Sequence, residues 1–234
     1  MTLRFTDTFP PGQPFPPGQP FPHRPSWPPD RPGEPGPPRQ PPAPGPVIQP
    51  TRIWLDPGAL PGGVYERLLE RRIVMASGRL DGAAATRLSA QLLTLDAEGE
   101  DPIRLELQGL DAELPAALTV MGVLDVIRVP VHAQAGGKVS GPALGVLASA
   151  SRRRAYPSAV FALSEPRVSF DGTVTALAAQ EEQVRVMLDE LYIRLAEVTG
   201  REVDEIRADA RRERLLTVDD AIAYGLIEGR AAGR

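Results

Sequence analysis

The sequence predicts an α/β domain built from repeated strand–helix units, preceded by a proline-rich tail. Of the 27 prolines, 19 lie in the first 50 residues, and the aliphatic residues concentrate further along the chain. There, short apolar runs alternate with longer segments of three-to-four-residue apolar spacing, which are typical of strands and helices respectively. Repeated strand–helix pairs require crossover connections, so the sheets should be largely parallel, with helices covering them.

Proline content also sets the expected domain boundaries. A segment that is nearly two-fifths proline donates few backbone hydrogen bonds and offers little apolar surface to bury. We therefore expect residues 1–46 to be a disordered tail, 47–63 a linker, and 64–230 the folded domain. The tail carries a repeat, Phe9-PPGQP-Phe15-PPGQP-Phe21, which is a docking peptide, a semi-rigid linker or a dispensable extension.

Composition excludes several classes of function. The net charge is −4 and the arginines are scattered, which argues against nucleic acid as a partner. The chain has no cysteine, so it forms no disulfide, thiolate nucleophile or cysteine-built zinc site. We expect no metal or other cofactor. No signal peptide or membrane-spanning run is apparent, and together with the absence of cysteine this predicts a soluble, cytoplasmic protein.

In the first half of the domain, helical spacing is clearest at Ala85, Leu88, Leu92 and Leu95, and Asp101-Pro102 breaks the chain before the next strand. The expected elements are a helix from Val64, a strand over 72–76, a turn at Ser77-Gly78, a helix over 82–97 and a strand over 103–107.

The second half repeats the alternation and ends in helices. The expected elements are a helix over 115–127, a strand over 129–133, a Gly-Gly turn, a helix over 141–149, a strand over 159–163, a long helix over 176–198 and two short helices. Gly200 suits the left-handed position that closes the long helix. Thr217 is a good N-cap for the last helix, with Asp219 and Asp220 in its first turn, and that helix should end near Gly225.

Two strings narrow the fold further. YERLLERRIVMASGRLDGAAATRLSAQLLTLDAEGEDPIRLEL resembles the opening of the ClpP family, the proteolytic component of the ATP-dependent Clp protease. VTGREVDEIRADARRERLLTVDDAIAYGLIE is similar to the end of that family's domain. The resemblance covers about residues 64–228. It implies the crotonase-like spiral α/β fold, with a handle helix in the C-terminal half.

The family's site needs a serine nucleophile, a histidine base and an orienting aspartate. The family's serine turn corresponds here to Ala135-GGKVSGPALG, which places Val139 at the nucleophile. Ser164 stands at the histidine, at the family's own spacing from Val139. Asp209 matches the aspartate, and we expect it to be a structural polar residue that caps the helix or pairs with Arg207, Arg211 or Arg212. The resemblance therefore implies a degenerate triad.

The oxyanion loop is altered as well. The family's "N-S-P-G-G" becomes Gln108-Gly109-Leu110-Asp111-Ala112. The resemblance makes Asp111, Ala112 and Ser140 the oxyanion-loop equivalents. Asp111 restricts the backbone shape that glycine permits and adds a negative charge near the oxyanion. Ser140 is also the alternative nucleophile, with Lys138 as a conceivable base. His132 is expected to be a core or interface residue.

The resemblance implies a structural subunit that enters a hetero-oligomeric ring beside catalytic ClpP paralogues and reaches an AAA+ unfoldase through that complex. The alternatives are a serine endopeptidase that uses Ser140 and, more weakly, a crotonase-like enzyme acting on thioesters. The linker over 47–63 corresponds to the family's axial-pore hairpin, for which its prolines are poorly suited. The handle, from Ser164 to Gly200, is about four residues shorter than the family's.

Overall fold

The computed structural model describes residues 63–168 and 173–231. In chain order, its elements are α1 (Val64–Glu70), β1 (Ile73–Leu80), α2 (Gly82–Glu98), β2 (Ile103–Ala112), α3 (Leu114–Val126), β3 (Val131–Gly136), β4 (Lys138–Ser140), α4 (Ala143–Ala148), β5 (Arg152–Ala155), β6 (Val160–Ala162), α5 (Val174–Thr199), α6 (Val203–Arg211), β7 (Leu215–Leu216), α7 (Val218–Tyr224) and β8 (Gly229–Arg230). The expected tail and nearly all of the expected linker lie outside the described residues.

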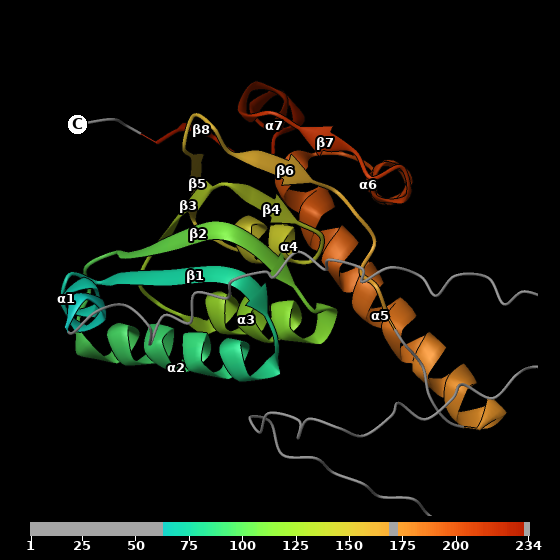
Figure 1. Cartoon of the computed structure of the whole chain (residues 1–234), viewed down its shortest axis with the longest axis horizontal. Coiled ribbons are helices and arrows are strands. Elements are labelled where there is room, and N and C mark those ends of the chain that lie inside the picture. The colour runs from blue at the N-terminus through green and yellow to red at the C-terminus, as the bar shows by residue number, and fades with distance from the viewer. Residues whose placement is uncertain (1–62, 169–172, 232–234) are drawn as a thin grey trace, which may run out of the picture. The chain divides into compact units, whose positions relative to one another are not determined.

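The described strands form an eight-stranded sheet with the order β7-β6-β4-β2-β3-β5-β8, and β1 pairs with β2. Their pairings are parallel, except for the antiparallel pair of β6 and β7. Helices α2 and α3 lie side by side along the β1–β2 part of the sheet (Figure 1). The predicted α/β fold with a largely parallel sheet is confirmed.

The core forms where alternate side chains of the strands meet the apolar stripes of the helices. Ile103, Leu105 and Leu107 of β2 are fully buried, and Leu88 and Leu92 of α2 join them in one hydrophobic cluster. Successive side chains of a strand point to opposite faces, so the residues between them face away from this core. Strand alternation therefore predicts a second, polar face.

The polar sheet face consists of Arg104, Glu106 and Gln108 of β2, His132 and Gln134 of β3, and Arg152 and Arg154 of β5. Glu106 is only 7% exposed and accepts hydrogen bonds from the Tyr156 hydroxyl (3.1 Å) and the Gln108 amide (3.3 Å). Arg104 pairs with its other oxygen at 3.2 Å. Burial and the Glu106 charge raise the pKa of Tyr156, so its hydroxyl stays protonated and donates. A buried carboxylate is tolerated on this face because several donors satisfy it.

The most consequential difference from the expectation is the length of the central strand. Strand β2 was predicted to end at Leu107, but it continues to Ala112, first beside β3 and then beside β4. The change of partner occurs at Gly109, whose φ is +58°. The predicted turn at Ser77-Gly78 is likewise wrong, since β1 runs on to Leu80 through an irregularity in register at Gly78. Glycine allows the strands to bend without breaking.

Other strands were missed because they are short or charged. Strand β4 has three residues, within a stretch predicted to be a turn. Strand β5 is Arg152–Ala155, whose arginines hide the strand pattern, and β7 and β8 have two residues each. The helices were predicted more closely, because caps mark them: Gly200 closes α5 with φ +69°, and Thr217 and Asp220 form a reciprocal capping box on α7.

Helix α5 has two unlike halves. Its C-terminal half buries Leu191, Tyr192 and Leu195 in the core, and Arg194 holds Asp125 of α3 through two hydrogen bonds of 2.7 Å. Its N-terminal half extends away from the sheet (Figure 1), and Val186 is 56% exposed. The resemblance assigns this element to the handle.

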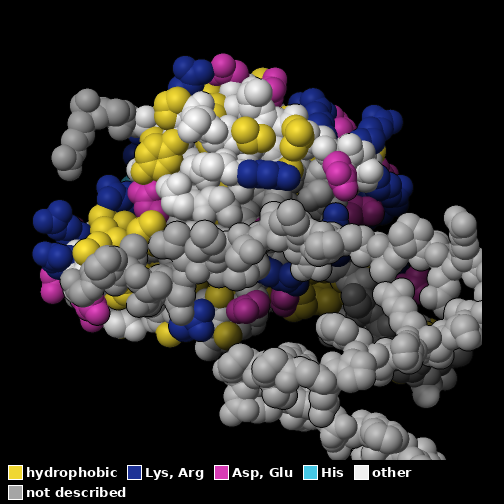
Figure 2. Space-filling model, viewed as in Figure 1, with side chains coloured by type: hydrophobic (Ala, Val, Ile, Leu, Met, Phe, Trp, Pro, Cys, Tyr) yellow, Lys and Arg dark blue, Asp and Glu magenta, His cyan; other side chains and the backbone are white. Residues whose placement is uncertain are grey.

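Within residues 63–168 and 173–231, no helix combines the length and the apolar character that a bilayer span requires. On the face that Figure 2 shows, basic and acidic side chains are interspersed rather than gathered into one basic stripe.

Replacing Gly137 tests the bend in the sheet. A Cβ at Gly137 would lie 3.3 Å from the backbone nitrogen of Gly109, and φ is +63°. We expect Gly137→Ala to lower the free energy of unfolding by about 1–2 kcal/mol, because a side chain disfavours this conformation. Gly122→Ala is the control: Gly122 lies in α3 with open space around it, and alanine should add about 0.5–1 kcal/mol. Urea unfolding of both variants gives the comparison, and equal stability would contradict this account.

Candidate functional site

Strands β4 and β6 bring together the residues that the sequence aligns with a nucleophile and a base. Val139 pairs with Phe161 and Ser140 with Ala162. The Gly141 amide then donates to the Ala162 carbonyl at 3.0 Å. Ser164 lies two residues after the end of β6, and its hydroxyl would lie 3.4 Å from a Cβ on Gly141. Residues 139–141 and Ser164 are therefore neighbours although 25 positions separate Val139 from Ser164.

Val139 cannot act as a nucleophile. Its side chain is aliphatic and fully buried in the hydrophobic core. Its alternation with half-buried Ser140 along β4 directs the two side chains to opposite faces of the strand. The position that the resemblance assigns to the serine therefore contributes to packing.

Three polar side chains gather beside it, around Gly141. The Ser140 hydroxyl lies 3.3 Å from Oδ1 of Asp111, to which it donates a hydrogen bond. The Asp111 Oδ1 and the Ser164 Oγ both lie within 4 Å of the point where a Gly141 side chain would start. Gly141 has φ +57°, so glycine suits both the conformation and the space. We call Asp111, Ser140 and Ser164 the polar cluster.

Asp111 and Ala112 belong to a regular strand rather than to a loop. They pair with Arg79 and Leu80 of β1, and Asp111 also pairs with Ser140 of β4. Neither has a positive φ. A backbone held between two strands is committed to its neighbours, whereas an oxyanion donor must point into free space where substrate can bind.

Asp209 of α6 is nearly buried, with 6% of its surface exposed, and two groups hold its carboxylate. The Tyr224 hydroxyl donates to Oδ2 at 2.8 Å, and the Arg214 guanidinium donates to the same oxygen at 2.9 Å. Arg214 also stacks over the Tyr224 ring, as does Arg201 from the end of α5. Burial and the Asp209 bond raise the pKa of Tyr224, which keeps it protonated. Asp209 is thus engaged structurally.

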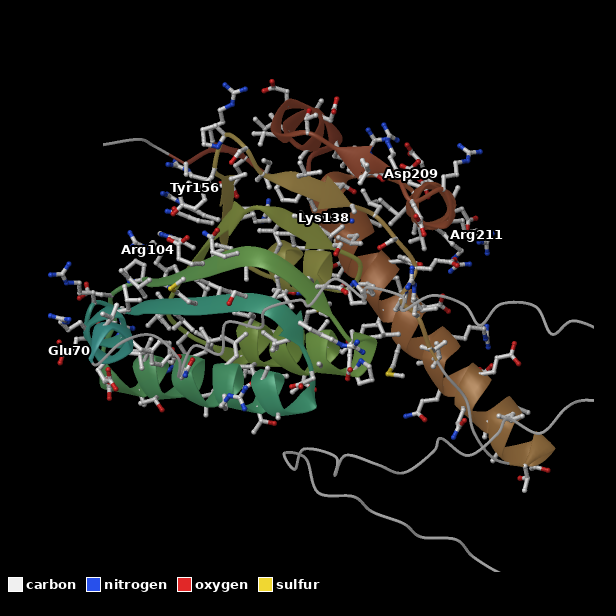
Figure 3. The ribbon with its side chains drawn as sticks, viewed as in Figure 1. Glu70, Arg104, Lys138, Tyr156, Asp209 and Arg211 are labelled. Atoms are coloured by element: carbon white, nitrogen blue, oxygen red, sulfur yellow. The ribbon has the colours of Figure 1, made fainter. Side chains whose placement is uncertain are left out.

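The predicted pairing of Asp209 with Arg207, Arg211 or Arg212 is wrong. Arg207 reaches back to Asp189 of α5 at 2.7 Å, and Arg211 lies 3.4 Å from Glu165. Arg207 and Arg211 lie two positions before and after Asp209, and residues two apart on a helix do not share a face. Arg214 lies beyond the C-cap Arg212, where the chain folds back toward Asp209. Figure 3 shows Asp209 and Arg211 on α6, with Lys138 on β4.

Neither alternative base, His132 or Lys138, forms a hydrogen bond with Ser140 in the described part of the chain. His132 lies half-buried on the polar sheet face, between Arg104 and Arg152. Lys138 shares a strand face with Ser140 but is exposed, and it forms no hydrogen bond or ion pair with any described residue. The described part of the chain also holds no group of acidic or histidine side chains that could bind a metal ion.

The comparisons with known proteins agree with this architecture. A family model described as Clp protease matches residues 61–231. The chain belongs to the Clp protease family. It is 29% identical over 174 residues to the ATP-dependent Clp protease proteolytic subunit 2 of Mycolicibacterium paratuberculosis, covering 72% of this chain and 86% of that protein. It is 31% identical over 168 residues to proteolytic subunit 1 of Nocardia farcinica, covering 70% and 85%.

Clp protease membership confirms the family and fold that the sequence predicted, and the chain is a Clp protease component built on a serine-peptidase fold. Two contributors to the site were missed, Tyr224 and Arg214. Tyr224 stands near the end of the second family-like string, and Arg214 lies five positions after Asp209. Only the fold shows that both meet the same carboxylate oxygen.

Tyr224→Phe tests the hold on Asp209. Removing the hydroxyl deletes a hydrogen bond to a buried carboxylate, and we expect the free energy of unfolding to fall by about 1.5–3 kcal/mol in urea. Tyr192→Phe is the matched control, because the buried Tyr192 hydroxyl has no hydrogen-bond partner among the described residues. Its removal should be neutral or slightly stabilising at pH 7. Equal effects of the two variants would contradict the assignment.

The same control predicts an effect of alkaline pH. Burial, with the nearby Glu165 charge, raises the pKa of Tyr192 to about 12. In the unfolded chain the tyrosine hydroxyl ionises at about pH 10. The stability that comes from keeping Tyr192 protonated is therefore fully present below pH 10 and is lost as the pH rises to about 12. We expect Tyr192→Phe to lose less stability than the wild type between pH 9 and pH 12. Parallel urea titrations across that range measure it.

Proposed function

We propose that this chain is a noncatalytic subunit of a Clp protease complex, acting as a structural and regulatory member of its ring. The observation that carries the proposal is that no serine–histidine pair forms at the triad-equivalent positions, all of which lie among the described residues. Val139 is buried in the core, Ser164 stands where the family has its histidine, and Asp209 is bonded to Tyr224 and Arg214. Loss of a triad serine or histidine costs on the order of a million-fold in turnover.

The polar cluster supports the same reading. In place of an oxyanion donor, it presents the Asp111 carboxylate next to Ser140 at 3.3 Å. A negative charge there opposes the oxyanion that develops during acyl transfer. Removing one donor alone costs roughly a hundred- to a thousand-fold, so the two defects compound.

The alternative function is a serine endopeptidase that uses Ser140. The contact with Asp111 favours it, because a carboxylate can accept a proton from a hydroxyl. General-base catalysis of acyl transfer most often uses histidine, and His132 forms no hydrogen bond with Ser140. The alternative also leaves the oxyanion without a donor. We therefore rank it second.

The proposed partners are the other components of a Clp protease complex. The related proteins are named ATP-dependent Clp protease proteolytic subunits, which supports a ring shared with catalytic paralogues and an AAA+ unfoldase reached through it. No cofactor, nucleic acid or membrane is needed for this role. The absence of cysteine favours the cytoplasm.

The handle bears on how rings would pair. The N-terminal half of α5 has little buried surface, and the stretch from Ser164 to Gly200 is about four residues shorter than in the family. The rest of the domain, outside the handle, keeps the alternating strands and helices that the resemblance implies. We infer that lateral ring contacts are retained, whereas the pairing of two rings made only of this chain is weakened.

A serine-directed phosphonate or lactone probe tests catalysis directly. We expect no labelling of the purified chain and no peptide-ester hydrolysis above background, with a catalytic ClpP paralogue as the positive control. Intact-mass analysis followed by peptide mapping locates any adduct. Labelling at Ser140 that disappears in Ser140→Ala would establish the serine endopeptidase and contradict the proposal of a noncatalytic subunit.

The double variant Val139→Ser, Ser164→His should also remain inactive, because Asp111 still occupies the oxyanion position and Asp209 still bonds Tyr224. Circular dichroism and thermal unfolding must first show that the variant folds. Substantial turnover by a folded double variant would mean that the Asp111 segment does supply a donor.

Native mass spectrometry tests the assembly. Co-expressed with a catalytic paralogue, the chain should appear in mixed complexes, whereas alone it should yield single rings or smaller species. The weakened handle is the physical reason for the difference. A stable two-ring particle of this chain alone would contradict the proposal, as would its exclusion from every mixed complex.

A further inference from the structure

An apolar groove with a volume of about 350 Å³ lies between β1 and α2, and the proposed function makes no use of it. Its buried floor is formed by Ala76, Leu80, Leu88 and Leu110. Half-buried Met75 and Ala84 also line it, and Arg79 and Arg87 stand exposed beside it. Ligand-sized pockets start at roughly 300 Å³, so one large side chain fits. We call this feature the β1–α2 groove.

Tyr65 of α1 also lines the groove, and its buried hydroxyl lacks a hydrogen-bond partner of standard geometry among the described residues. Burial raises its pKa, while the neighbouring Gln91 amide lowers it. A buried hydroxyl without a partner is costly, so an occupant that can donate a hydrogen bond there gains affinity.

The chain itself provides such an occupant a short distance away. The described residues begin at Gly63, next to α1, and the triplet Ile53-Trp54-Leu55 precedes it. Seven residues separate Leu55 from Gly63, and an extended chain of that length reaches roughly 25 Å. Two of these residues are proline, which lowers the entropy lost on ordering.

We propose that Ile53-Trp54-Leu55 docks in the β1–α2 groove of its own chain, with the Trp54 ring on the apolar floor. An indole provides the large apolar area that the floor requires and an N–H that can donate to the Tyr65 hydroxyl. Asp56 follows the triplet directly, and its charge complements Arg87 at the rim, where Arg79 already pairs with Glu113 at 2.7 Å. Arg87 forms no ion pair with any described residue, so it is available. The proposal stands independently of whether the chain is catalytic.

Docking would fasten the chain to the domain just before α1. The proline-rich tail would then depart from the groove rather than from Gly63. Loop closure over so few residues costs little, and tethering gives the triplet a high effective concentration near the groove.

Tryptophan fluorescence of the full chain tests the proposal. The sequence has two tryptophans, so Trp27→Phe leaves Trp54 as the sole reporter. We expect its emission to be blue-shifted and poorly quenched by acrylamide. Adding Ala84→Arg, which fills the groove with a charged side chain, should shift the emission red and raise the quenching constant several-fold.

The matched control is Ala83→Arg, which places the same side chain one position earlier on exposed α2, outside the groove. It should leave the emission unchanged, as should deletion of residues 1–46. Equal, solvent-like quenching of Trp54 in all variants would overturn the proposal. A blue shift that disappears on dilution, together with dissociation of a dimer, would assign the occupant to a second copy and overturn it equally.

Discussion

Two left-handed glycines, Gly109 in β2 and Gly137 between β3 and β4, meet where the sheet divides. A Cβ on Gly137 would stand 3.3–3.4 Å from the Gly109 backbone, so the strands approach this closely because Gly137 lacks one, while Gly109 supplies the positive φ of the bend. Up to Gln108, β2 pairs with β3, and from Asp111 it pairs with β4. The polar cluster lies immediately beyond the bend, so its geometry depends on this contact.

The framework of a peptidase site and its chemistry are separable in this fold. Backbone pairing of β4 with β6 places residue 139 near residue 164 whatever their side chains are. The Leu163 amide donates to the Arg214 carbonyl at 2.9 Å, and the Arg214 amide donates to Asp209, which ties α6 to the same edge. Because main-chain contacts build the scaffold, Val139 can serve the hydrophobic core at a position that the family gives to a nucleophile.

Much of the fold could be predicted because its signals are local. Gly200 and the Thr217 capping box mark helix ends within a few residues, and the family strings fix the order of elements. The continuation of β2 past Leu107, the strand at Arg152 and the partners of Asp209 could not be predicted, because each depends on tertiary pairing. For Glu106, the alternation with Arg104 and Gln108 was visible in the sequence, but only the structure shows that Tyr156 supports it.

The polar sheet face affects whether unassembled copies of the chain associate with one another. An exposed apolar sheet surface promotes aggregation, because two identical surfaces can stack face to face. Here Arg152 and Arg154 project from β5 without an ion pair among the described residues, and Glu106 is already neutralised by Arg104. Stacking two such faces would place arginines next to arginines and remove their hydrating water, and both effects raise the free energy of the stacked state. The charge on the polar sheet face therefore disfavours the stacking of one copy of the chain on another.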